Sequence, residues 1–214
     1  MPPHARPVAG FPLGEPLLYL RAVTDDKDRN ICCSLENVFD QQLALIQPVA
    51  VMPGERHFAV FRPDGAVLLY LSWLDERSPG EPELAMQVTD ANGRLVGRLR
   101  RTTPVAQFSR CHGGTLGLEA NRQWLGATEI HQNRSDKPIP IFDGSGTRIG
   151  RIYGQLMYST GYKSTQRSFS DYLLDVPQPK PYPMPELMLA GLFAQYLAER
   201  IQQGPVSRWF GGSA

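Results

Sequence analysis

Three stretches of the chain share one pattern of apolar and polar positions: an apolar strand, a turn containing Asp and Gly, and a second apolar strand. These stretches are residues 57–73, 84–101 and 139–154, and a weaker fourth copy with Asn in its turn covers 117–130. Glycine supplies the positive φ of tight hairpins, and Asp can bond the backbone amides that follow it. The pattern predicts four β-hairpins, whose turn residues are Asp64, Gly65, Asp90, Gly93, Asn121, Asp143 and Gly146.

Strict alternation in the second hairpin predicts which side chains share a face of its second strand. One face is expected to carry Leu95, Gly97 and Leu99. The other is expected to carry Arg94, Val96, Arg98 and Arg100.

The N-terminal part of the chain adds three more apolar segments with strand character, at 16–23, 29–35 and 42–51. With the hairpins they make about ten to twelve strands, and hairpin connections make neighbouring strands antiparallel. So many strands must hide their edges, and closure into a barrel does that best.

The most apolar stretch lies near the C-terminus, where Gln195 is the one polar residue between Leu187 and Ala198. Prolines precede this stretch and Gly204-Pro205 follows it, so we expect a helix over about 185–203. A membrane span needs about 20 predominantly apolar residues, and a shorter run that is apolar on nearly every side favours a buried helix over a membrane anchor. The residues expected in the core are Leu187, Leu189, Leu192, Phe193, Tyr196, Leu197 and Ile201.

The fold expected from these elements is mainly β, a closed antiparallel barrel wrapped around a C-terminal hydrophobic helix. One domain is expected over 15–203, between an N-terminal arm (1–14) and a C-terminal tail (204–214). The N-terminus has no apolar signal-peptide region, and three cysteines make no disulfide framework, so we expect a cytoplasmic protein that is not secreted. The chain has 22 basic and 21 acidic residues, so its net charge is close to zero and no nucleic-acid partner is expected.

The chain contains no GxSxG motif, no P-loop and no dinucleotide-binding fingerprint. The four histidines are scattered, and His112 next to Cys111 on a strand would point to the opposite face. A non-enzymatic role is therefore favoured, and no catalytic residue is assigned.

The order of these elements resembles the tubby C-terminal-like superfamily. The closest likeness is to the phospholipid scramblase family, followed by the plant LURP-one-related proteins. The resemblance covers about Val38 to Ile201, with "HFAVFRPDGAVLLYL", "LAMQVTDANGRLVGRLRR" and "IPIFDGSGTRIGRIYG" similar to the family's hairpins. The stretch "DYLLDVPQPKPYPMPELMLAGLFAQYLAERI" resembles its closing strand and helix. The fold that the resemblance implies is a barrel of about 12 strands around a central helix.

The resemblance also implies a function, because tubby-like domains bind phosphoinositide head groups through basic side chains on the barrel. The candidates here are Arg94, Arg98, Arg100, Arg101, Arg148, Arg151, Lys163 and Arg167. Family scramblases carry an acidic loop before the last strand, proposed to bind calcium. Ser168 and Ser170 replace those acids here and leave only Asp171 and Asp175 as calcium candidates, so we expect no cofactor.

Three hypotheses about function follow from the sequence. The first is a scramblase-like or tubby-like protein, peripheral at the membrane, that binds anionic phospholipids or phosphoinositides. The second is a soluble module on the same barrel that binds a protein partner. The third is an enzyme whose site lacks a recognisable motif, which a deep polar pocket lined by His112, Asp171 or Asp175 would support.

Overall fold

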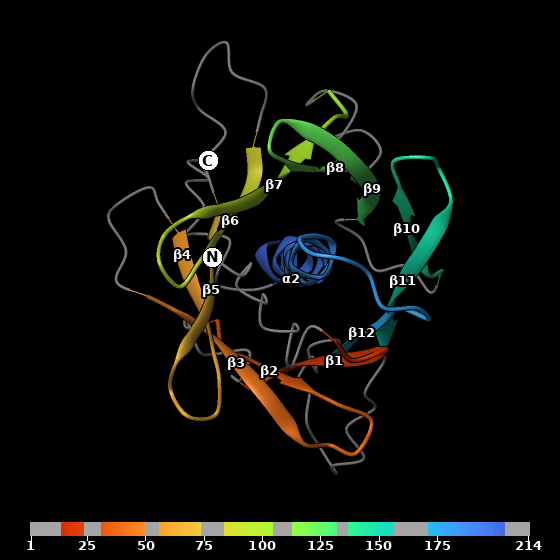
Figure 1. Ribbon diagram of the computed structural model, residues 1–214. Coiled ribbons are helices and arrows are strands. Elements are labelled where there is room, and N and C mark those ends of the chain that lie inside the picture. Colours follow the sequence, from red (N-terminus) through yellow and green to blue (C-terminus); the bar gives the residue numbers. More distant parts are fainter. Residues whose placement is uncertain are drawn as a thin grey trace.

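The protein folds as a closed antiparallel β-barrel of twelve strands wrapped around one C-terminal helix, as the sequence predicts (Figure 1). The computed structural model describes residues 14–23, 31–49, 56–73, 84–104, 113–131, 137–155 and 171–203. The strands in them are β1 (Leu17–Ala22), β2 (Cys33–Glu36), β3 (Gln42–Pro48), β4 (Arg56–Phe61), β5 (Val67–Trp73), β6 (Leu84–Asp90), β7 (Leu95–Arg101), β8 (Gly113–Ala120), β9 (Gln123–His131), β10 (Ile139–Asp143), β11 (Arg148–Gln155) and β12 (Asp171–Asp175). The helix is α2 (Met184–Gln203).

Each strand pairs with the strands before and after it in the sequence, and β1 pairs with β12 to close the barrel. At the closure Leu17 lies opposite Asp175, and the Val176 amide donates to the Pro16 carbonyl at 2.8 Å. Closure leaves the twelve described strands without a free edge that another chain could extend.

The hairpin turns have the chemistry expected from their sequence. Gly65, Gly93 and Gly146 have φ values of 84°, 76° and 83°. The carboxylates of Asp90 and Asp143 each accept two backbone amides of their own turns, and Asp64 accepts one. These bonds fix the turns without help from the rest of the molecule.

The face predicted for Leu95 is wrong, and a β-bulge is the reason. Val88 lies opposite Gly97 and Thr89 opposite Leu95, so Val96 is an extra residue in β7. Val96 is consequently buried, whereas Leu95 is 45% exposed. Beyond the bulge the expected alternation holds, with Leu99 inside the barrel and Arg98 outside.

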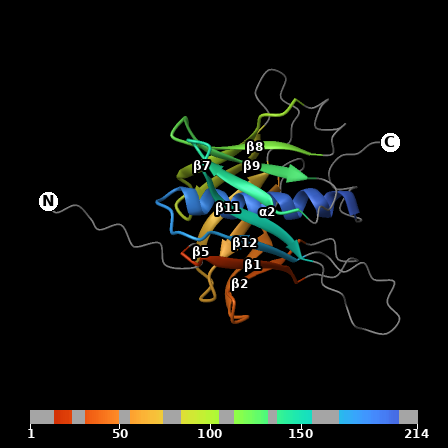
Figure 2. The same ribbon diagram turned by 90° about the vertical axis from the view of Figure 1, so that its right-hand side faces the viewer.

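Helix α2 runs along the axis of the barrel and forms the centre of the core (Figure 2). Every side chain from Met184 to Glu199 is buried, which confirms the predicted buried helix. Six of the core residues that the sequence predicted are 0–2% exposed: Leu187, Leu189, Leu192, Phe193, Tyr196 and Leu197. The side chain of the seventh, Ile201, lies outside the described residues. Phe193 packs edge-on against Phe58 of β4, with ring centres 4.9 Å apart. Burial of each large apolar side chain contributes roughly 1.5–3 kcal/mol before entropy losses.

The two ends of the barrel differ. The tight hairpin turns of the described residues (37–41, 62–66, 91–94, 121–122 and 144–147) all lie at the end where α2 begins, which we call the turn end. The helix contacts confirm its direction, since Leu187 lies beside Gly97 near the start of β7 and Gln195 lies beside His131 at the end of β9. No helix among the described residues is long and apolar enough to cross a membrane. The proposed arm (apart from Gly14) and tail lie outside the described residues.

Candidate functional site

A groove of about 800 Å³ lies on the outside of the barrel, near the turn end. It is formed by β7, by the end of β8 and by the turn that leads into β9. We call it the arginine groove. Its polar lining is Arg98, Arg100, Glu119, Asn121 and Arg122, and its apolar lining includes Leu95 and Trp124.

The alternation of β7 aims two of the predicted arginines into this groove. Leu99 is fully buried, so its neighbours Arg98 and Arg100 lie on the outer face. Across the ladder, Arg98 lies opposite Glu119 and Arg100 opposite Gly117. The same alternation turns Arg101 inward, where it is 8% exposed, so Arg101 is no part of the groove.

The groove carries more positive than negative charge. Arg100 Nη1 lies 3.7 Å from the Glu119 carboxylate, too far for a strong hydrogen bond. Among the described residues, neither Arg98 nor Arg122 forms an ion pair. The groove therefore contains three guanidinium groups and one carboxylate. A guanidinium group can bind a phosphate through paired hydrogen bonds.

Arg122 was not among the residues predicted from the sequence. It follows Asn121 in the β8–β9 turn, and both have left-handed backbones, with φ of 62° and 51°. Glycine is the usual second residue of such a turn, because a side chain there is strained. The signal in the sequence was an Asn-Arg pair at the turn of the weakest hairpin, where Asn-Gly is usual.

Trp124 gives the groove an apolar wall. A Cβ built on Gly117 would collide with the Trp124 ring, so the ring lies directly over the Gly117 backbone on the outer face of β8. Trp124 is nevertheless 48% exposed. The lack of a side chain at Gly117 therefore lets Trp124 lie against the barrel beside the arginines.

The other basic candidates lie elsewhere. Arg148 and Arg151 are on β11, which β8, β9 and β10 separate from β7, an arc of about 19 Å. Arg151 lies 3.3 Å from the Asp175 carboxylate, with its guanidinium 5.6 Å from the centre of the Tyr153 ring. Arg94 is exposed in the turn before β7. Lys163 and Arg167 lie outside the described residues.

The two calcium candidates are not brought together either. Asp171 and Asp175 lie at opposite ends of β12, and each faces a different arginine. The Arg21 guanidinium lies 3.9 Å from Asp171 and also contacts Glu36 at 3.1 Å and Asp40 at 2.7 Å. Burial raises the pKa of the Asp171 carboxyl, although Arg21 acts in the opposite direction. No group of three metal-binding side chains occurs in the part of the chain that the structure describes.

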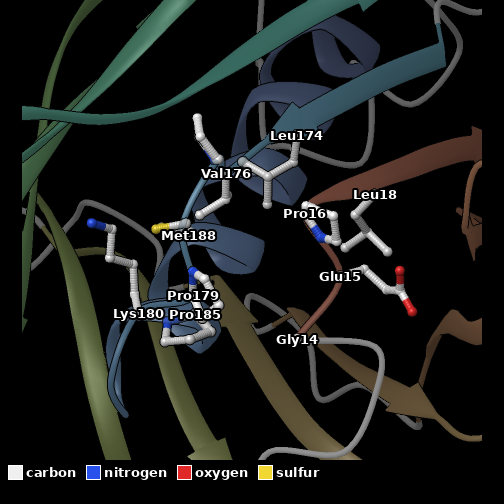
Figure 3. A pocket seen from close by; sticks show the side chains of 11 residues that line it. Gly14, Glu15, Pro16, Leu18, Leu174, Val176, Pro179, Lys180, Pro185 and Met188 are labelled. Atoms are coloured by element: carbon white, nitrogen blue, oxygen red, sulfur yellow. The ribbon is translucent and has the colours of Figure 1, made fainter.

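A smaller cleft of about 290 Å³ opens at the turn end, where β1 and the segment after β12 meet the start of α2. Its lining is mostly apolar, with Leu174, Val176 and Met188 gathered on one side and Pro16 and Leu18 on the other (Figure 3). Neither Asp171 nor Asp175 lines this cleft or the arginine groove. His112, the third residue of the enzyme hypothesis, lies outside the described residues.

Comparison with known proteins finds little that is close. No family model matches the chain, and no curated protein matches it significantly. Among solved structures, the fold is similar to the crystal structure of a protein from Arabidopsis thaliana. The two sequences are 13% identical, the alignment covers 85% of this chain and 93% of the other, and the TM-score is 0.44.

Proposed function

We propose that the protein binds anionic phospholipid head groups at a membrane surface, without catalysis, and that the arginine groove is the binding site. The observation that carries the proposal is the convergence of Arg98, Arg100 and Arg122 on one groove that holds a single carboxylate, Glu119. A phosphate in the groove would be within reach of several guanidinium groups at once, which a single surface arginine does not provide.

The resemblance to the tubby C-terminal-like superfamily, and within it to the phospholipid scramblase family, supports the same function. The superfamily's fold is a twelve-stranded barrel around a buried helix, and its tubby-like members bind phosphoinositides through basic side chains on the barrel. The hairpin "LAMQVTDANGRLVGRLRR", which resembles the family's second hairpin, supplies both Arg98 and Arg100.

The setting that fits this function is the cytoplasmic surface of a membrane, with the protein bound peripherally. That leaflet carries anionic lipids, and each arginine near such a surface adds about 1 kcal/mol of attraction. Because this attraction is electrostatic, binding should weaken as salt shortens the Debye length.

Vesicle flotation tests the proposal. The full chain is mixed with neutral phosphatidylcholine vesicles and with vesicles that also contain phosphatidylserine or a phosphoinositide. We expect the protein to float only with the anionic vesicles, and to be released at high salt. Equal recovery with neutral and anionic vesicles would overturn the proposal.

A pair of charge-reversal variants locates the site. Arg98→Glu combined with Arg122→Glu changes the groove, whereas Arg56→Glu combined with Lys137→Glu makes the same change in net charge at the opposite end of the barrel, outside the lining of the groove. We expect the groove variant to lose vesicle binding and the matched variant to retain most of it. Equal losses in the two variants would show that only overall charge matters and that the groove is not the site.

A further inference from the structure

The turn end of the barrel exposes several large apolar side chains. The described residues contain six large exposed apolar side chains, and five lie at the turn end: Val38, Phe39, Leu95, Trp124 and Tyr182. The sixth, Val23, follows β1 at the opposite end. A single exposed apolar residue needs no explanation, but five at the turn end, two of them beside the groove arginines, fit a surface that contacts something apolar.

The turns present these side chains on a fixed backbone. Phe39 is 83% exposed, although its turn is well ordered by hydrogen bonds: Asn37 Oδ1 accepts the Phe39 amide at 2.9 Å and the Gln41 amide at 3.1 Å. Trp124 is supported by the Gly117 backbone, and Leu95 is exposed by the bulge in β7. Little conformational entropy would therefore be lost when these side chains leave water.

Two of these residues also line the arginine groove. Leu95 and Trp124 flank Arg98, Arg100 and Arg122, so apolar and cationic groups meet at one site. Aromatic and aliphatic side chains next to arginine suit the boundary between lipid head groups and acyl chains, where Trp is enriched. A soluble phosphorylated molecule would use the arginines but would leave both apolar side chains in water.

We propose that the barrel docks on an anionic bilayer with its turn end, and that Leu95 and Trp124 insert at the interface beside the phosphates held in the arginine groove. This inference rests on the proposed function and adds the orientation of the barrel and the physical form of the ligand. The ligand is a phospholipid within a bilayer. The positive charge of the groove matches the anionic head groups, and the exposed apolar side chains match the boundary beneath them.

Co-sedimentation with phosphatidylcholine/phosphatidylserine vesicles measures the contribution of the apolar residues. Leu95→Ser combined with Trp124→Ser should weaken partitioning by about tenfold or more, while the net charge and all groove arginines are unchanged. Val23→Ser, at the opposite end, should bind like the unmodified protein. Leu95→Ser alone serves as a second variant, because Leu95 is 45% exposed and can be replaced with little change to the core, and a thermal melt verifies that each variant is folded.

A competition experiment tests the form of the ligand. Glycerol phosphate or inositol hexakisphosphate is added to the vesicle-bound protein at the same total phosphate as the anionic lipid. We expect the bilayer to retain the protein. Release at equimolar phosphate would overturn the docking inference and leave the groove as a site for soluble phosphates.

The outcomes separate this inference from the proposed function. In one outcome, vesicle binding survives the two serine substitutions but is lost when the charges of Arg98 and Arg122 are reversed. That outcome supports head-group binding and overturns the docking inference. Absence of vesicle binding by the unmodified protein overturns both, and would favour a protein partner for the turn end.

Discussion

The side-chain amide of Gln195 holds the main chain of His131 with two hydrogen bonds. Oε1 accepts the His131 amide at 2.8 Å, and Nε2 donates to the His131 carbonyl at 2.8 Å. Gln195 is 3% exposed and belongs to the central helix, whereas His131 ends β9 in the barrel wall. Apolar packing alone would let a helix rotate or slide, and this pair of directed bonds fixes both movements.

Replacement of Gln195 by Met should therefore destabilise the protein. Methionine fills nearly the same volume but leaves the partly buried amide and carbonyl of His131 without these bonds, at a cost of about 1–3 kcal/mol. Urea denaturation measures the change in the free energy of unfolding. His131→Ala is the control, because Gln195 bonds the main chain there, and it should cost less than about 1 kcal/mol. Equal stability of Gln195→Met and the unmodified protein would show that these bonds do not secure the helix.

Two glycines at the contact between α2 and the barrel wall should respond in opposite ways to alanine. A Cβ on Gly191 of α2 would lie 3.5 Å from Thr128 Cγ2, an ordinary contact, and alanine favours the helix by about 0.5–1 kcal/mol. A Cβ on Gly97 would lie 2.5 Å from the Glu119 carbonyl oxygen and 2.8 Å from Leu187 Cδ2.

We expect Gly191→Ala to raise the free energy of unfolding and Gly97→Ala to lower it by about 1–3 kcal/mol. Thermal and urea unfolding of both variants provides the measurement. A stability loss in Gly191→Ala comparable to that of Gly97→Ala would show that α2 is packed more tightly than the structure indicates.

The hairpins and the helix could be predicted because their signals are local. Each Asp/Gly turn is stabilised within four or five residues, and the apolar run between Leu187 and Ala198 is long enough to identify a helix buried on all sides. Gln195, the exception in that run, was visible in the sequence. Its partner was not, because His131 is 64 residues away in the chain.

The candidate site was predictable only in part, because it depends on register and on strand order. Alternation correctly placed Arg98 and Arg100 on the outer face but failed at Leu95, where pairing with β6 inserts a bulge. The pairing of β7 with β8, which no single segment encodes, places the β8–β9 turn beside β7, and β11 lies three strands beyond β8. Arg122 was missed because it lies in the turn of the weakest of the four hairpins, and because the sequence does not show that this turn lies beside β7.

The buried carboxyl of Glu186 should make stability depend on pH. Burial raises the pKa of Glu186 above its ordinary value of 4.5, and only its own backbone amide acts in the opposite direction. A raised pKa in the folded state means that the protein is stabilised at acid pH, and that this stability is lost as pH rises from about 4.5 through the folded pKa.

Glu186→Gln should remove this loss. We expect the variant to be more stable than the unmodified protein at pH 7, by about 1.4 kcal/mol for each unit by which the folded pKa is raised, with the two converging below pH ~4. Urea unfolding between pH 3 and 8 checks both statements. Glu15→Gln removes the same charge at the same end of the barrel and is the control for the change in net charge. A less stable Glu186→Gln variant at pH 7 would mean that the helix N-terminus compensates the buried charge.

The strained turn at Arg122 makes stability and binding separable. Its φ of 62° costs an arginine about 1 kcal/mol that a glycine would not lose, so Arg122→Gly should raise the free energy of unfolding by about 0.5–1 kcal/mol. The same substitution removes one of three guanidinium groups from the arginine groove and should weaken binding to anionic vesicles several-fold.

Arg122→Lys keeps both the charge and the strain, so its stability should match that of the unmodified protein and most of its binding should remain. Melting temperature and vesicle partitioning are measured on the same samples. A variant that gains stability and binds as before would show that Arg122 takes no part in lipid binding, whereas a gain in stability with weaker binding would identify the strained arginine as a residue retained for function.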